Sequence, residues 1–341
     1  MTVLVTGAAG FLGINVVRRL ARDGHQVVGF DTVELPESAR TAAFGDLPNV
    51  VDVRGDVCRP DDLANVMRTY EVTRVVHLGA VTVARDESPE RTGTAVRVNV
   101  VGTANVLAAC ARHNVGRCLI VSSSAVYGDT VFGTAPVTED VTPVPRSVYG
   151  ITKLAAEELA AAALRRDGVD TVVARVTALF GPWERPTCSR TLPSPLWQLL
   201  AMADAGQRVT VASGGHRDWT YVEDAAAALA ALLTAKRPRY RVYNVGCGAV
   251  WSPAVLAELL KMTQPGFDYT VAESDTNLSY GDDLNRKRHP LDSSRLRTEY
   301  GIAFAGPESA CRRYYEWWQQ YRHHVNQPLC AGWRNQSQIV R

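Results

Sequence analysis

Short hydrophobic runs alternate with longer amphipathic stretches through the first half of the chain. The run Cys118–Val121 is apolar without interruption, which is typical of a strand buried on both faces of a parallel sheet. Strict alternation of strands and helices predicts an α/β fold in which helices cover both faces of that sheet. The expected strands are Thr2–Thr6, Gln26–Asp31, Val50–Arg54, Arg74–Leu78, Arg117–Ser122 and Thr171–Val176, and the expected helices are Phe11–Arg22, Pro60–Tyr70, Ala95–His113 and Ser147–Arg166.

After Pro182, strand and helix patterns no longer alternate regularly. The stretch Trp183–Pro195 is rich in proline, threonine, serine and arginine, and we expect a long ordered loop of the kind that carries function. Beyond it, the pattern predicts a strand at Arg241–Val245 and helices at Pro253–Met262 and Pro307–Tyr321 outside the main sheet. We therefore expect a doubly wound domain made of residues 1–182 and 216–247, a smaller C-terminal substrate lobe made of residues 183–215 and 248–333, and a tail at 334–341.

Composition limits the partners of the chain. Its 341 residues carry a net charge of +2 and are 46% hydrophobic, and no run of lysine and arginine indicates a nucleic-acid partner. The first residues have the pattern of a strand rather than of a signal peptide, and no apolar run reaches membrane-spanning length. The seven cysteines are scattered without a close pair. We expect a cytoplasmic protein that binds neither nucleic acid, nor a membrane, nor a metal.

A glycine-rich turn joins the first expected strand to the first expected helix. Gly7 permits a tight turn, Gly10 lets the backbone approach a pyrophosphate, and Gly13 lets the helix pack closely on the sheet. The start of the helix adds free N–H groups and a partial positive charge. Because a strand precedes this turn and a helix follows it, the pattern predicts a Rossmann-type dinucleotide-binding fold.

Two acidic residues after later strands fit the same ligand. Asp31 ends the second strand, where a carboxylate accepts hydrogen bonds from the adenosine ribose and repels a 2′-phosphate, so we expect NAD rather than NADP. Asp56 follows the third strand and can meet the adenine amino group, with Val57 packing on the ring. Taken alone, such an acid is more often a helix N-cap or a loop residue.

Tyr149 and Lys153 are four residues apart, so they share one face of the expected helix. A tyrosine has an unperturbed pKa near ~10, and a neighbouring ammonium and the positive nicotinamide both favour its phenolate. Tyr149 can then exchange a proton with a substrate hydroxyl during hydride transfer. A serine at the end of the strand before it, Ser123 or Ser124, can hydrogen-bond the same substrate oxygen.

Together these motifs resemble the extended short-chain dehydrogenase/reductase family, which includes sugar-nucleotide epimerases and dehydratases. The resemblance extends over residues 1–321 and also rests on His77–Ala80, Asn99–Thr103, Arg175–Pro182 and Arg217–Asp224. It implies that Ser123 is the family's hydroxyl, with Ser124 as the alternative. The cofactor-binding residues that it implies are Gly7, Gly10, Phe11, Leu12, Gly13, Asp31, Asp56, Val57, Leu78, Gly79, Ala80, Asn99, Tyr149 and Lys153, and it places Arg217 in the substrate cleft.

Two departures from the family pattern bear on the reaction. Family dehydratases and decarboxylases carry acids where this chain has Ser124 and Ala125, so neither reaction is expected here. Members that hold a nucleotide sugar usually have asparagine where this chain has Ala178, which removes a polar contact to the phosphates. Arg185, Arg190 and Arg217 can each bind a phosphate or carboxylate of the substrate, although any one of them is more often a solvated surface residue.

Three functions remain open. The first is epimerisation of a sugar, in the form of a nucleotide sugar, by transient hydride abstraction at a secondary alcohol with NAD retained. The second is an NAD-dependent dehydrogenase of a sugar acid, polyol or related metabolite. The third is an NAD-binding sensor without turnover, against which the complete serine, tyrosine and lysine set argues. The resemblance favours the epimerase.

The helical stretches Ala95–Ala111 and Leu154–Leu164 are apolar on more than one face. One face of each has to cover the sheet, and small side chains on the other suit close helix packing. We therefore expect a homodimer with a twofold axis through these two helices, in keeping with the family. The alternative is a helix buried within one subunit.

Overall fold

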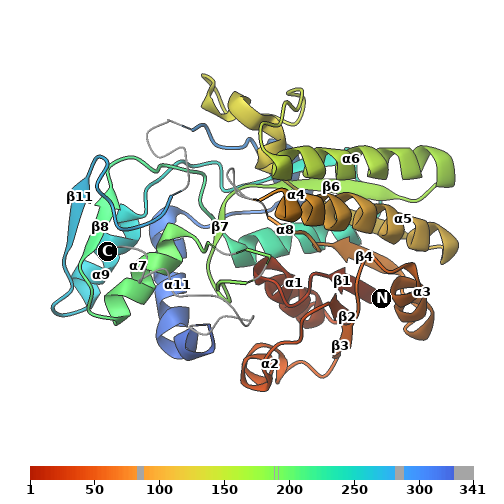
Figure 1. Ribbon diagram of the computed structural model, residues 1–341, viewed down its shortest axis with the longest axis horizontal. Coiled ribbons are helices and arrows are strands. Elements are labelled where there is room, and N and C mark those ends of the chain that lie inside the picture. The colour runs from red at the N-terminus through yellow and green to blue at the C-terminus, as the bar shows by residue number, and fades with distance from the viewer. Residues whose placement is uncertain (83–87, 188, 191, 281–287, 326–341) are drawn as a thin grey trace.

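The structure, a computed structural model, describes residues 1–82, 88–187, 189–190, 192–280 and 288–325. Its centre is a seven-stranded sheet in the order β10-β6-β5-β4-β1-β2-β3, in which all paired strands are parallel (Figure 1). This confirms the Rossmann-type α/β fold. The strands are β1 (Thr2–Thr6), β2 (Gln26–Asp31), β3 (Val50–Arg54), β4 (Arg74–His77), β5 (Arg117–Ser123), β6 (Thr171–Val176) and β10 (Val242–Val245).

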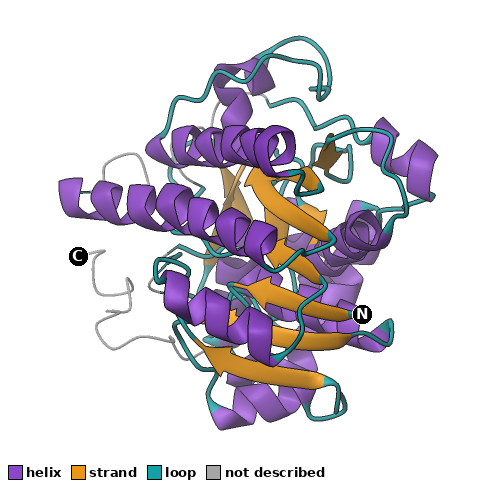
Figure 2. Ribbon diagram, turned by 90° about the vertical axis from the view of Figure 1, so that its right-hand side faces the viewer, coloured by secondary structure: helices purple, strands orange, loops and turns teal. Residues whose placement is uncertain are grey.

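Helices cover both faces of this sheet (Figure 2). Alternate residues of one strand explain why, since Leu119 and Val121 belong to one hydrophobic cluster whereas Cys118 and Ile120 belong to another. The first cluster includes α1 and α8, and the second includes α3, α5 and α6. The bounds are α1 (Phe11–Arg22), α2 (Glu37–Phe44), α3 (Pro60–Thr69), α4 (Pro89–Val96), α5 (Thr103–Arg112), α6 (Val148–Asp167) and α8 (Val222–Thr234).

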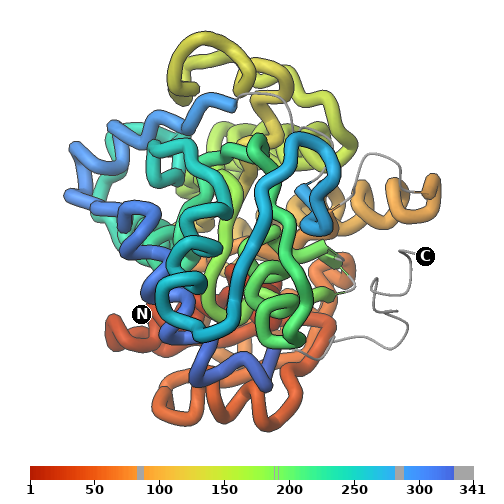
Figure 3. Tube along the Cα trace, turned by 90° about the vertical axis from the view of Figure 1, so that its left-hand side faces the viewer, coloured from red at the N-terminus to blue at the C-terminus, as the bar shows by residue number. Residues whose placement is uncertain are grey.

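The remaining elements gather at one end of the sheet. β8 (Val209–Ala212) pairs in parallel with β11 (Tyr269–Ala272), so two segments far apart in the sequence lie side by side (Figure 3). An aromatic cluster around Phe180, which contacts the rings of Tyr221, Trp251 and Tyr314, joins this part to the main sheet. The other elements are β7 (Leu179–Phe180), β9 (Thr220–Tyr221), α7 (Pro195–Asp204), α9 (Ala254–Thr263), α10 (Ser294–Tyr300) and α11 (Pro307–Tyr321).

The expected helix Ala95–His113 differs from the structure. The helical segment begins earlier, at Pro89, where the Ser88 hydroxyl caps its first turn by accepting a hydrogen bond from the Arg91 N–H. A π-helical turn, Arg97–Gly102, then separates α4 from α5. Such a turn fits one extra residue into a helix and is frequent at functional sites. The hydrophobic period alone does not predict it.

By length and composition, the continuous helix Pro89–Arg112 is able to cross a membrane, although the sequence pattern predicts no apolar run of that length. In the structure it lies in the helical layer over the sheet, with Val106, Leu107 and Cys110 buried. A core helix meets the same criterion, so this feature is weak support for a membrane span.

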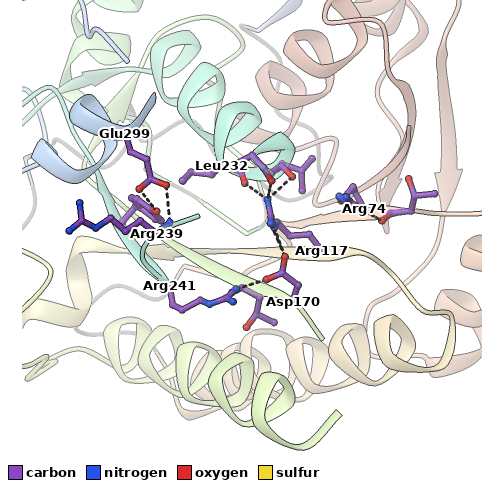
Figure 4. A network of polar contacts seen from close by, with 12 residues as sticks. Arg74, Arg117, Asp170, Leu232, Arg239, Arg241 and Glu299 are labelled. Atoms are coloured by element: carbon purple, nitrogen blue, oxygen red, sulfur yellow. Dashed lines mark hydrogen bonds and ion pairs between the residues drawn. The ribbon is translucent and has the colours of Figure 1, made fainter. Parts of the chain in front are cut away.

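A buried arginine connects the central sheet to α8 at the edge formed by the amino ends of the strands. Arg117, the first residue of β5, donates from Nη1 to the carbonyls of Leu232, Leu233 and Ala235 at the C-terminus of α8 (Figure 4). Its Nη2 lies 2.7 Å from Asp170 Oδ2, and Asp170 also pairs with Arg241. The guanidinium therefore satisfies carbonyls that the helix end leaves unpaired.

Candidate active site

The glycine turn between β1 and α1 has no room for side chains. Gly7 has a φ of +71°, and a Cβ there would lie 2.8 Å from the Gly79 nitrogen. A Cβ on Gly13 would lie 2.0 Å from the Gly7 oxygen. Helix α1 begins at Phe11 with Gly10 as its N-cap, so no capping side chain stands in front of the first amides. The turn therefore leaves these N–H groups open to an anion.

Asp31 lies at the end of β2, beside this turn. Its Oδ2 accepts a hydrogen bond from the Ala9 N–H at 3.0 Å, and its Oδ1 accepts one from the Val33 N–H at 3.2 Å. Burial raises the pKa of Asp31, whereas these hydrogen bonds act in the opposite direction. The carboxylate is thus fixed where β2 ends.

One cavity of about 340 Å³ is lined by eight of the fourteen expected cofactor residues, whereas its lining does not include Phe11, Leu12, Gly13, Asn99, Tyr149 and Lys153. Its lining fits a dinucleotide, because it combines the glycine turn, a ribose-binding carboxylate and the apolar walls of Val57 and Leu78. Asp56 reaches the cavity as well, although its Oδ1 also accepts a hydrogen bond from the Cys58 N–H at 2.8 Å. The expected residues that line it are Gly7, Gly10, Asp31, Asp56, Val57, Leu78, Gly79 and Ala80.

A buried hydrogen-bond chain runs under the cavity from β1 to the π-helical turn. The Thr103 hydroxyl donates to the Asn99 carbonyl at 2.6 Å, so it has to accept from His77 Nε2–H at 3.0 Å. His77 Nδ1 is then an acceptor for the Thr6 hydroxyl at 2.7 Å. Burial lowers the pKa of His77 to about 3, in agreement with a neutral ring. Sequence reasoning gave no role to Thr6, His77 or Thr103.

Asn99 continues this chain toward the catalytic helix. Its Oδ1 accepts from the Val81 N–H at 2.8 Å, and its Nδ2 donates to the Val81 carbonyl at 3.0 Å and to the Thr152 hydroxyl at 3.0 Å. Thr152 in turn donates to the Tyr149 carbonyl at 2.9 Å. Asn99 thus fixes the backbone of the cavity wall against the helix that carries Tyr149.

Tyr149 and Lys153 lie on the first turns of α6, which Ser147 caps by accepting from the Gly150 N–H at 3.1 Å. Burial raises the pKa of Tyr149, whereas a hydrogen bond with Ser123 lowers it. Ser123 is therefore near enough to Tyr149 to affect the pKa of its phenol, and Ser124 begins the next helical segment, Ser124–Phe132. Lys153 is only 4% exposed, and burial lowers its pKa to about 8.

A buried ion pair lies one helical turn beyond Lys153. Glu157 Oε2 lies 2.7 Å from Arg175 Nη2, both side chains are 6% exposed, and the Ser122 hydroxyl also donates to Glu157. The charge of Glu157 raises the pKa of Lys153, against the effect of burial. Sequence reasoning missed Glu157, although its spacing of four residues from Lys153 on one helix face was a usable signal.

The three expected substrate arginines contact different elements. Arg185 is 2% exposed, its Nη1 donates to the His324 carbonyl at 3.5 Å, and its Nη2 has no hydrogen-bond partner among the described residues. Burial lowers the pKa of Arg185 to about 10. Arg217 Nη2 donates to the Tyr280 carbonyl at 2.7 Å.

The third arginine, Arg190, lies at the cofactor turn. Its guanidinium lies over the Phe11 ring, 5.3 Å from the centroid, and its Nη2 lies 2.8 Å from Glu184 Oε1. Sequence reasoning missed Glu184, whose acid side chain gives no local pattern to mark it.

Comparison with known proteins agrees with this arrangement. Residues 3–246 match the NAD dependent epimerase/dehydratase family. The chain is 33% identical over 338 residues to the dTDP-glucose 4,6-dehydratase of Streptomyces niveus, which covers 94% of this chain and 95% of that protein. It is 30% identical over 285 residues to UDP-glucuronate 4-epimerase 4 of Arabidopsis thaliana, which covers 77% of this chain and 63% of the relative.

Solved structures extend the likeness to the fold. The UDP-glucuronic acid 4-epimerase from Bacillus cereus, in complex with UDP-glucuronic acid and NAD, has a TM-score of 0.76 at 24% identity and covers 94% of this chain and 99% of its own. MoeE5 in complex with UDP-glucose and NAD has a TM-score of 0.74 at 28% identity and covers 94% and 100%. The chain therefore belongs to the NAD-dependent epimerase/dehydratase family, within the extended short-chain dehydrogenases/reductases, and is an NAD-dependent enzyme.

Proposed function

We propose that this protein is a nucleotide-sugar epimerase that inverts a secondary alcohol of the sugar and keeps its NAD. The observation that carries the proposal is the set of Ser123, Tyr149 and Lys153 in a site where positions 124 and 125 hold no acid. Relatives named as UDP-glucuronate 4-epimerases support this substrate class. The same relatives support an enzyme of sugar metabolism.

The chemistry divides between the cofactor and the protein. NAD, when bound, would supply reversible two-electron transfer at the carbinol carbon of the sugar. Tyr149 takes the hydroxyl proton and later gives it back, while Ser123 donates a hydrogen bond to the same oxygen. Lys153 binds the nicotinamide ribose, and its ammonium favours the phenolate of Tyr149. Gly10, Phe11 and Leu12 would hold the pyrophosphate at the start of α1.

Dehydration is the reaction of several relatives, but it requires a further proton transfer at a neighbouring carbon. An acid next to the serine serves that step in family dehydratases, and this chain has Ser124 and Ala125 there. Neither side chain exchanges a proton with a carbon acid at neutral pH. The pair therefore favours epimerisation over dehydration.

A net dehydrogenase is the second candidate, and Ala178 is the residue that favours it. An amide at this position usually meets the nucleotide phosphates in the family, and alanine offers no such contact. Arg185 is buried with a side-chain nitrogen that no described residue satisfies, and a buried guanidinium with a free donor suits an anionic group of the substrate. Arg217 would join it. These contacts suit either a nucleotide sugar or a sugar acid.

The cofactor content of the purified protein separates the two candidates. We expect NAD close to one per chain to remain after extensive dialysis, because an epimerase returns the electrons to the same substrate. Nucleotide sugars are then screened for an epimerised product. A chain that is empty as purified and produces NADH from sugar acids or polyols with added NAD would replace the epimerase by the dehydrogenase.

We also propose a homodimer formed by the helices α4, α5 and α6. Three large hydrophobic side chains lie exposed on this layer, namely Val96 at 44%, Val101 at 47% and Ile151 at 54%. Neighbouring exposed apolar residues on adjacent helices are typical of a protein–protein interface. Packing of the α5–α6 layer against a second copy would bury them.

A further inference from the structure

The loop that follows β7 forms one wall of the cofactor cavity. Thr187 and Ser189 line this cavity, and the Ser189 carbonyl accepts a hydrogen bond from the Thr82 N–H at 3.0 Å. Thr82 follows β4, on the other side of the cavity. This hydrogen bond therefore fixes the loop beside the cofactor cavity as well as beside the substrate lobe.

Arg190 on this loop is fixed by a buried acid. Glu184 is fully buried, with its Oε1 accepting from the Ser194 N–H at 2.7 Å and its Oε2 accepting from the Ser194 hydroxyl at 2.6 Å. Its Oε1 also accepts from Arg190 Nη2 at 2.8 Å. Because an unpaired charge is costly to bury, Glu184 holds the guanidinium in one place.

That place lies between the two ends of the dinucleotide site. The guanidinium stacks on Phe11, the first residue of α1, where the glycine turn ends. Its charge also lowers the pKa of Tyr149, which marks the nicotinamide end. The Arg190 side chain is 32% exposed, and Glu184 takes only one of its three nitrogens among the described residues. The other donors remain available to a ligand.

We propose that Arg190 is a cofactor-binding residue whose guanidinium binds the pyrophosphate of NAD, an assignment that rests on the proposed function. The α1 amides supply the first set of donors, and Arg190 supplies a full positive charge opposite the same anion. Sequence reasoning had assigned Arg190 to the substrate. Glu184 becomes a positioning residue that acts through Arg190.

The test compares ligands that differ in their phosphates, with the full-length chain freed of NAD. Calorimetry measures binding of adenosine, ADP-ribose and NADH. Arg190→Met is expected to weaken ADP-ribose and NADH binding about 10- to 100-fold, the effect of one charge-assisted hydrogen bond or two. Adenosine binding is expected to stay unchanged, because adenosine carries no phosphate. NAD release from the loaded protein should accelerate to a similar degree.

Three further variants test whether an unpaired buried acid or a general loss of positive charge explains the result. Because Arg190→Met leaves Glu184 buried without its cation, the comparison is repeated between Glu184→Gln and the double variant Glu184→Gln/Arg190→Met. Arg54→Met removes an exposed positive charge at the end of β3, paired in register with Asp31. It should change ADP-ribose affinity by less than about twofold, because a solvated charge outside the pyrophosphate site is screened.

The possible results distinguish a wrong assignment of Arg190 from a wrong proposed function. Unchanged ADP-ribose affinity in the arginine variants, or a change confined to the KM of the nucleotide sugar, would overturn the assignment of Arg190. Equal weakening of adenosine and ADP-ribose would also overturn it, because a general loss of the site does not depend on phosphate. A wild-type chain that binds none of the three ligands would contradict the proposed function itself.

Discussion

At the scale of single residues, burial changes the pKa values of Tyr149 and Lys153 in opposite directions. Desolvation disfavours the charged form of each group, so it raises the pKa of the phenol and lowers that of the ammonium to about 8. Ser123 and Arg190 oppose the shift at Tyr149, and Glu157 opposes it at Lys153. The site thus holds an acid–base pair whose charges depend on neighbouring residues.

Replacement of Tyr149 by phenylalanine tests the proton-transfer role. Tyr149→Phe should lower turnover about 10²- to 10⁴-fold, the usual contribution of a positioned acid–base group, and leave NAD content nearly unchanged. Tyr269→Phe is the matched control, because it removes a hydroxyl whose hydrogen-bond partner among the described residues is Glu258, on the surface of the lobe. Activity in Tyr149→Phe equal to that of the control would contradict the catalytic assignment.

The Lys153 ammonium predicts a pH dependence. The group is protonated below its pKa of about 8, so turnover of the loaded enzyme should fall as the pH rises through that value. The charge of Glu157 raises this pKa, so Glu157→Gln should move the fall to lower pH. The pH profile of kcat for both proteins provides the measurement. A fall of kcat at the same pH in both proteins would show that deprotonation of Lys153 does not cause it.

At the scale of elements, a hydrogen-bond chain connects the glycine turn, β4, the π-helical turn and α6. Thr6 accepts from the amides of Leu78 and Gly79, both at 3.2 Å, and also bonds His77. Each hydroxyl in the chain donates one bond and accepts at least one, so a missing hydroxyl leaves at least two partners unsatisfied. Elements that carry the cofactor and the catalytic helix are thereby held in one arrangement.

Thr103→Val tests this chain, because valine keeps the shape of threonine and removes its hydroxyl. The change leaves His77 Nε2–H and the Asn99 carbonyl without that partner, and it should lower the free energy of unfolding by about 1–3 kcal/mol. Thr171→Val removes a single buried bond from a hydroxyl to the Ala160 carbonyl and serves as control. Equal losses in urea unfolding, with unchanged NADH affinity in both, would contradict a role for the chain.

At the scale of the whole molecule, the two edges of the parallel sheet carry different groups, one set for binding and one for stability. Its carboxyl edge carries the glycine turn, Asp31 and Ser123, whereas the opposite edge carries the Arg117–Asp170 network. The exposed side chains Val96, Val101 and Ile151 lie on α4, the π-helical turn and α6, in the helical layer over one face of the sheet. The cofactor cavity reaches this layer, because Thr94 of α4 and Val98 of the π-helical turn line it.

The dimer proposal predicts that Val101→Glu and Ile151→Glu each produce a monomer. Both side chains are exposed in the single chain, so a glutamate there costs little in the monomer but introduces like charges across a twofold axis. Val271→Glu, on the 57% exposed Val271 of β11, is the control and should leave assembly unchanged. Sedimentation at micromolar concentration is the measurement, and a monomeric wild type would contradict the proposal.

The sequence predicts most of the central sheet because buried parallel strands are uninterrupted apolar runs. It does not predict α8, whose residues are buried on nearly all sides and so lack an amphipathic period. The short strands β8 and β11 are stabilised by pairing across distant segments, which local pattern does not reveal.

For the site as well, the sequence predicts what local motifs encode and misses what depends on tertiary contacts. The glycine turn and the spacing of Tyr149 and Lys153 are local motifs, so the sequence predicts both. It also predicts the dinucleotide-binding site, whose cavity the glycine turn lines. Glu157 is marked by its spacing of four residues from Lys153, although its pairing with Arg175 depends on the fold. Glu184 and Thr103 act only through residues that the fold brings to them, and nothing in their local sequence marks them. For such residues tertiary contact is the sole signal.

The most direct test of the proposed epimerase follows deuterium in the product. The NAD-loaded protein, with no cofactor added, is given nucleotide sugars whose sugar carbons are fully deuterated. We predict an epimer of unchanged mass, because the deuterium removed from the carbinol carbon returns to that carbon, and no net rise in absorbance at 340 nm. A product lighter by one water would indicate a dehydratase. In a parallel reaction to which NAD is added, loss of the carbinol deuterium to that NAD, with a rise at 340 nm, would contradict the epimerase and establish a dehydrogenase.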